Sequence, residues 1–185
     1  MKVLISLALS ILSLCLFAFP QDQPVPRRGP STPEERKRFV TLVHKLEKNP
    51  LDSSLDSEVK WALQWLDDIP DITVTICWAP LGHFVMEEYR YDSRIRAQFI
   101  LGMGAVQIER PPRQADAVYL AGVESALKAY RSILKSQPEA RSRTLDEIQS
   151  MQDNNRLPDY LHDVSKVCDE DKNMALARPP YHHPR

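Results

Sequence analysis

The sequence predicts an all-α fold: a compact multi-helix domain of about six helices, with segment 71–78 as the one stretch that can also be extended. Apolar residues recur every three or four positions through most of the chain, which is the period of a helix with one buried face. Proline-containing pairs (Asn49-Pro50, Pro111-Pro112 and Gln137-Pro138) divide the chain into segments of helix length. The chain holds only one alternating stretch that could form a strand.

The first helix is predicted from its start and stop signals. Thr32 can cap it, Pro33 is favoured at the first helical position, and Glu35 completes a capping box with Thr32. Asn49-Pro50 ends it. We therefore expect a helix that starts at residues 32–33 and stops before Asn49.

A second helix is expected to begin at Asp52 or Ser54 and to reach about Asp68. Trp61 and Trp65 lie one turn apart and widen its apolar face to about half of the circumference. A helix with so wide an apolar face is usually covered on two sides. We interpret the tryptophan pair as core rather than as a platform for a ligand.

Segment 71–78 follows a different pattern. Ile72, Val74, Ile76 and Trp78 alternate with smaller or polar residues, which is typical of a half-buried strand. The chain offers no second strand, and an isolated strand leaves its backbone groups without partners. Three alternatives stay open: an extended segment packed on helices, an edge that pairs in a dimer, or a helix.

Four further helices are expected: from the cap Asp92 to about 110, from about 114 to 136, from a capping box at Thr144–Glu147 to Asn154, and from Pro158 to about Cys168. A stripe of small residues marks the first two of these four. We expect it to let them pack antiparallel at unusually short distance, which offsets the cost of about 1 kcal/mol for a glycine inside a helix. The stripe is Gly102, Ala105, Ala121, Gly122 and Ser125.

The N-terminal segment predicts export. Lys2 precedes an apolar run from Val3 to Phe19, which is the layout of a secretory signal peptide. The alternative is a membrane anchor, but the run is at the short end of what spans a bilayer. We divide the chain into a signal peptide (1–20), a flexible linker (21–31), a helical domain (32–168) and a loose tail (169–185). The processed protein is expected to be soluble, secreted or periplasmic, and without membrane contact.

Two cysteines stay in the chain after removal of the signal peptide. Cys77 and Cys168 form an even number in an oxidising compartment, which favours a disulfide between them. The alternative is two unrelated thiols, with Cys77 buried as a small apolar residue.

Composition and motifs exclude several classes of function. The net charge is −1 with interspersed signs, so there is no basic face for nucleic acid. No catalytic motif, phosphate-binding loop or dinucleotide fingerprint is found, and we predict no catalytic residues, cofactor or metal ligands. One acidic group, Asp67, Asp68 and Asp71, lies where it opposes a helix dipole. A solvated helix end explains this group better than an ion site does.

One helix resembles a known repeat. Ala126, Tyr130 and Pro138 stand at the spacing of the second helix of a tetratricopeptide repeat. The resemblance covers residues 126–138 only, and the preceding residues depart from the family pattern at Arg110, Arg113-Gln114 and Ala117. The family's period of 34 residues is absent, which favours a compact domain over stacked repeats. The resemblance implies a protein-binding role.

Two hypotheses for function follow. The first is a non-catalytic module that binds an unknown protein partner or assembles with itself. The alternative is a hydrolase or metal-dependent enzyme that uses acidic and histidine residues at helix ends.

Overall fold

The computed structural model describes residues 28–111 and 114–177, and every regular element in these ranges is a helix. The all-α prediction is therefore confirmed, with six α-helices and two short 3₁₀ helices among the described residues. In chain order they are α2 (Pro33–Lys48), η1 (Ser53–Leu55), α3 (Asp56–Asp68), η2 (Ala79–Met86), α4 (Asp92–Glu109), α5 (Ala115–Ser136), α6 (Arg143–Asp153) and α7 (Leu157–Ala177).

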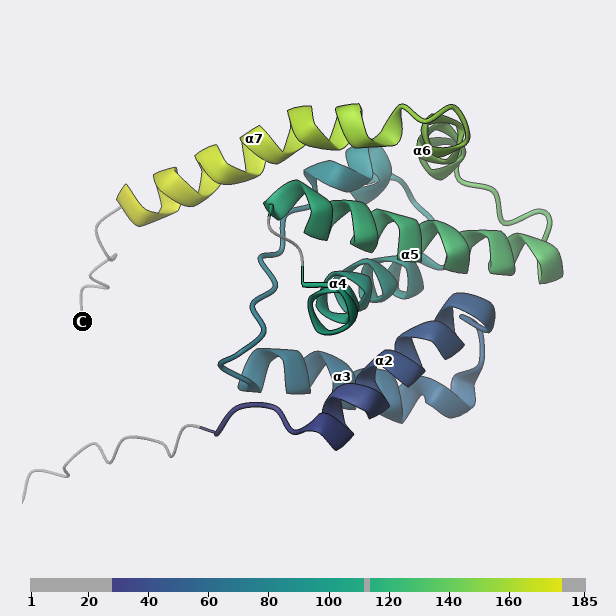
Figure 1. Ribbon diagram of the computed structural model, residues 1–185. Coiled ribbons are helices and arrows are strands. Elements are labelled where there is room, and N and C mark those ends of the chain that lie inside the picture. The colour runs from purple at the N-terminus through teal and green to yellow at the C-terminus, as the bar shows by residue number, and fades with distance from the viewer. Residues whose placement is uncertain (1–27, 112–113, 178–185) are drawn as a thin grey trace, which may run out of the picture.

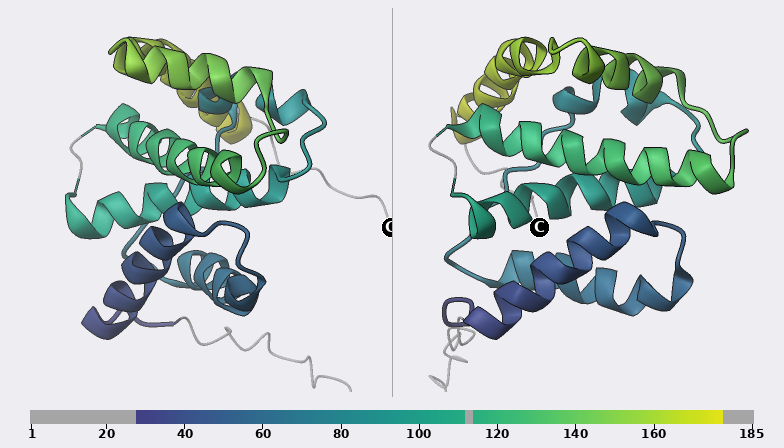
Figure 2. Two further views of the ribbon diagram at one scale, coloured as in Figure 1. Left: turned by 90° about the vertical axis from the view of Figure 1, so that its right-hand side faces the viewer. Right: turned by 45° about the vertical axis from the view of Figure 1, so that its right-hand side comes forward.

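The helices form three layers (Figure 1). α4 and α5 run side by side through the middle, with α2 and α3 on one side and α6, α7 and η2 on the other; both views in Figure 2 agree. Two apolar cores result. The first lies among η2, α4, α5, α6 and α7 around Phe99 and Tyr130. The second lies among α2, α3 and α4 around Phe39 and Trp65. Helix α4 contributes to both cores.

The crossing of α4 and α5 depends on two glycines. A Cβ placed on Gly102 would lie 2.5 Å from Ser125 Cβ and 3.1 Å from the carbonyl oxygen of Ala121. One placed on Gly122 would lie 2.8 Å from the carbonyl oxygen of Phe99. Real Cβ atoms essentially never come within 3.0 Å of another heavy atom, as the Cβ at either position would, so a side chain there would force the helices to shift. The predicted close packing along the small-residue stripe is thus confirmed.

The helix starts predicted at Thr32 and at Asp52 are both found in the structure. Thr32 Oγ1 accepts from the Glu35 amide, and the Glu35 carboxylate accepts from the Thr32 amide, which completes the predicted capping box. Asp52 caps η1 by accepting from the Ser54 amide, and α3 continues from it.

The tryptophan pair divides between core and surface. Trp65 is fully buried against Phe39, as expected. Trp61 is only half-buried, and the guanidinium of Arg38 lies 3.7 Å above its ring.

The connection between α3 and η2 excludes one of the three alternatives for this segment, the helix. Residues 72–78 form neither helix nor strand, and the chain runs here along one side of the molecule from the layer of α3 to that of η2 (Figure 1). Cys77 is joined to Cys168 of α7, in agreement with the predicted bridge. Ile72 is buried but Ile76 is 52% exposed. The alternation fails because the bridge turns Cys77 toward α7 and its neighbour outward.

Two predicted helix starts are wrong. Asp92 does not cap α4 but is its first residue, where its carboxylate accepts from Arg96 Nε at 2.7 Å. Ser142, not Thr144, caps α6 by accepting from the Leu145 amide at 3.2 Å. Ser142 is fully buried, and Glu87, the residue that follows η2, accepts from its hydroxyl. Tertiary contacts therefore select Ser142 over the capping box read from the sequence.

Helix α7 is longer than predicted. Its backbone stays helical to Ala177, because residues 169–177 contain good helix formers and neither glycine nor proline. Leu157, Leu161 and Cys168 are buried, whereas Val167 is 49% exposed. The bridge at Cys168 sets the rotation of the helix and leaves the preceding residue at the surface.

The predicted signal peptide lies outside the described residues, as do most of the linker and the end of the tail. At the described end of the linker, the Ser31 amide donates to Asp71 Oδ1 at 2.8 Å. Within residues 28–111 and 114–177, no helix is both long and apolar enough to cross a bilayer.

Candidate functional site

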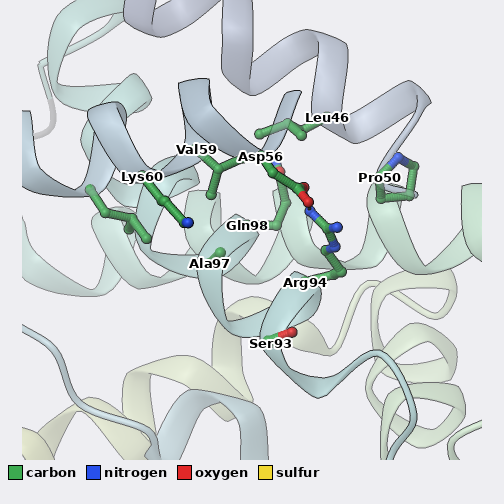
Figure 3. A pocket seen from close by; sticks show the side chains of 10 residues that line it. Leu46, Pro50, Asp56, Val59, Lys60, Ser93, Arg94, Ala97 and Gln98 are labelled. Carbon is green, nitrogen blue, oxygen red and sulfur yellow. Dashed lines mark hydrogen bonds and ion pairs between the residues drawn. The ribbon is translucent and has the colours of Figure 1, made fainter. Parts of the chain in front are cut away.

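A pocket of about 310 Å³ opens between α2, α3 and α4. Figure 3 shows Leu46 and Val59 on one side of it, Ala97 on the other, and charged side chains around them. Ten residues line it: Leu46, Pro50, Asp56, Val59, Lys60, Leu63, Ser93, Arg94, Ala97 and Gln98. The pocket therefore joins an apolar floor to a polar rim, the usual make-up of a binding site.

Helical spacing brings these residues to one face. Asp56, Val59, Lys60 and Leu63 follow each other at steps of three, one and three along α3, so they share one side of that helix. On α4, residues 93, 94, 97 and 98 have the same helical spacing and form the opposite wall of the pocket. The end of α2 closes the remaining side with Leu46 and the buried Pro50.

The rim carries an excess of positive charge. Arg94 Nη1 lies 2.5 Å from Asp56 Oδ1 and forms an ion pair across the pocket, from α4 to α3. Lys60 is exposed, and its ammonium group has no hydrogen bond or ion pair within the described part of the chain. With one acid and two bases, the rim has a net charge of +1.

Gln98 is the most buried polar residue of the wall, with only 2% of its surface exposed. Its Nε2 donates to the Val43 carbonyl oxygen at 3.2 Å and to Ser125 Oγ at 2.7 Å. A carbonyl oxygen can only accept, so this contact fixes which end of the amide is nitrogen. Both N–H groups are thereby used, whereas no hydrogen bond to Oε1 is found among the described residues.

Behind this wall, a polar chain links α2, α4 and α5. Ser125 Oγ donates to Glu47 Oε1 at 2.8 Å, and Lys128 Nζ lies 3.2 Å from the same oxygen. His44 lies between Glu47 Oε2, at 3.1 Å, and Glu109 Oε1, at 2.9 Å.

The contacts in this chain shift two pKa values. Burial would raise the pKa of Glu47, but hydrogen bonds from His44 and Ser125 and the charge of Lys128 lower it overall. The hydrogen bond to Glu109 raises the pKa of His44, and burial only partly opposes it. These hydrogen bonds favour the charged forms of both Glu47 and His44.

The residues of the predicted acidic group contact separate partners. Asp71 turns away to accept from Ser31 Oγ and Arg36 Nη2, both at 2.7 Å, and Asp68 accepts from Gln64. Burial would raise the pKa of Asp71, but these partners lower it to about 2. Asp67 lies exposed beside them. Among the described residues, no three histidine, cysteine or acidic side chains converge as metal ligands.

The sequence reasoning missed the pocket and its polar residues. Lys60 and Arg94 belong to segments that were correctly predicted as helices, and the periodic run 56, 59, 60 and 63 was visible. A lysine among apolar positions on one helix face is the signal that could have marked this site.

Comparison with known proteins gives no relative. No family model matches the chain, and neither a curated protein nor a solved structure does so.

Proposed function

We propose that this protein is an exported, non-catalytic helical module that binds a partner protein, or a second copy of itself, through the pocket between α2, α3 and α4. The pocket is the observation that carries the proposal, because it joins an apolar floor to a rim with a lysine that has no partner among the described residues. Such a lysine is available to an anionic group of another molecule.

The order of groups in the polar chain supports a non-catalytic role. In a nucleophilic triad, the histidine stands between the hydroxyl and the acid. Here Glu47 stands between Ser125 and His44, so the histidine does not reach the hydroxyl oxygen. Ser125 is also buried, with 3% of its surface exposed. The hydrolase alternative has no comparable support, since Asp68 and Asp71 of the acidic group are engaged with separate partners.

Two features support export. The N-terminal run behind Lys2 has the layout of a signal peptide. The bridge between Cys77 and Cys168 spans 91 residues, and such structural disulfides persist in oxidising compartments.

Photo-crosslinking from the pocket tests the proposal. In the processed chain, Ser93→Cys carries a benzophenone at the exposed edge of the pocket, and Ser150→Cys on α6 carries the same label in the opposite layer. After incubation with extracellular or envelope proteins, we expect adducts from position 93 only. Light scattering distinguishes a second copy from another protein. A monomer that forms no adduct from position 93 would overturn the proposal.

A further inference from the structure

The chemistry of the pocket indicates which chemical groups of a partner can bind in it. We propose that the pocket takes the C-terminal residue of a peptide that ends in an aliphatic side chain. This inference rests on the proposed binding function. Three separate groups of the pocket match the three parts of such a residue: its carboxylate, its side chain and its backbone N–H.

The carboxylate matches the cations of the rim. Lys60 has no partner among the described residues, and Arg94 uses only Nη1 for Asp56, which leaves other guanidinium N–H groups for a ligand. A carboxylate is an anion that such groups commonly bind, and charge-assisted hydrogen bonds to it are stronger than neutral ones.

The aliphatic side chain of the peptide would lie against the apolar floor of the pocket. Val59, Leu63 and Ala97 contribute apolar surface from two facing helices, and Leu46 closes the inner end. A volume of about 310 Å³ lies at the lower limit for small-molecule sites, which run from about 300 to 1,000 Å³. This space suits one aliphatic residue rather than a long hydrocarbon chain.

The backbone N–H of the peptide would donate a hydrogen bond to Gln98. Its Oε1 is an unused acceptor on a side chain that is 98% buried and held rigidly by Val43 and Ser125. A hydrogen bond from the ligand would satisfy this acceptor. A peptide offers an N–H next to its last side chain, whereas a fatty acid offers none, and this difference favours the peptide.

The test uses ¹H–¹⁵N NMR titration of the processed chain. The ligands are acetyl-Ala-Ala-Leu with a free carboxylate, the same peptide with a C-terminal amide, and octanoate. We expect the acid to bind at least tenfold more tightly than the amide, with shifts at residues 60, 94 and 98. In Lys60→Met, the preference for the acid over the amide should become smaller, because only Arg94 then remains to bind the carboxylate. Lys37→Met removes an exposed lysine of α2 outside the pocket and should change nothing.

Any of the following results would contradict the proposed peptide site. Equal binding of acid and amide to the unmodified chain would exclude a carboxylate site. Octanoate that binds as tightly as the peptide acid would point to lipid carboxylates. If the peptides do not bind while position 93 still forms adducts with a protein, this inference fails and the proposed function stands. If position 93 forms no adducts either, both fail.

Discussion

Replacing Gly122 by alanine tests the close approach of α4 and α5. The added Cβ would lie 2.7 Å from Met103 Cγ and 2.8 Å from the carbonyl oxygen of Phe99. Because the carbonyl belongs to a helix backbone, the clash is relieved only by moving the helices apart. Such overpacking costs up to about 3 kcal/mol. Alanine recovers about 1 kcal/mol of helix propensity. The free energy of unfolding should therefore fall by about 2 kcal/mol.

Gly104 provides the matched control on α4. A Cβ there would meet Leu66 Cδ2 at 2.9 Å and Phe39 Cζ at 3.0 Å, which are the ends of side chains that can shift. A steric cost of about 1 kcal/mol is then offset by a gain in helix propensity of about the same size. Gly104→Ala should be nearly neutral.

Urea and thermal denaturation, followed by far-ultraviolet circular dichroism with the disulfide intact, measure both variants. For a chain of this length, 2 kcal/mol corresponds to a fall in Tm of about 4–8 °C. If Gly122→Ala unfolds at the same temperature as the unmodified chain, or together with Gly104→Ala, the helices can separate without cost and the packing argument is refuted.

Three other changes test separate features. Replacing Cys77 and Cys168 together by serine should lower the free energy of unfolding by about 4–5 kcal/mol, because the bridge closes a long loop in the unfolded chain; a loss below about 1 kcal/mol in urea titrations would contradict this. Ser142→Ala should lower the free energy of unfolding by about 1–2 kcal/mol, because α6 loses its cap. The control Ser150→Ala, at an exposed position of the same helix, should leave the Tm unchanged. Asp71 has a folded pKa of about 2, below its usual 3.8, so its stabilising effect is present above pH 4 and is lost as the pH falls toward 2. Asp71→Asn should therefore be less stable than the unmodified chain at pH 7 and nearly equal to it at pH 2; a difference that does not change with pH would contradict the assignment.

Much of the fold follows from local signals in the sequence. The start of α2 needed only residues 32–35, and the packing of α4 on α5 needed only the small-residue stripe, because these features depend on neighbouring or periodically spaced residues. The wrong predictions concern features that depend on contacts between residues far apart in the sequence. Ser142 caps α6 because Glu87 and Tyr130 hold it, and neither contact is visible in the local sequence.

The candidate site was less accessible to sequence reasoning than the fold. Its residues come from three helices, and their meeting depends on how α2 and α3 pack on α4. Lys60 and Arg94 each resemble an ordinary surface base when read singly. The disulfide was easier to predict, because two cysteines allow only one pairing.

The two separate cores have a consequence for how this protein can change over time. The pocket belongs to the core of α2, α3 and α4, whereas the disulfide and α6 brace the other core. Substitutions that reshape the pocket alter few contacts in the braced layer, because the layer of α4 and α5 stands between the two. Sequence changes around the pocket can therefore accumulate on one side of the molecule while the disulfide-linked side keeps its packing.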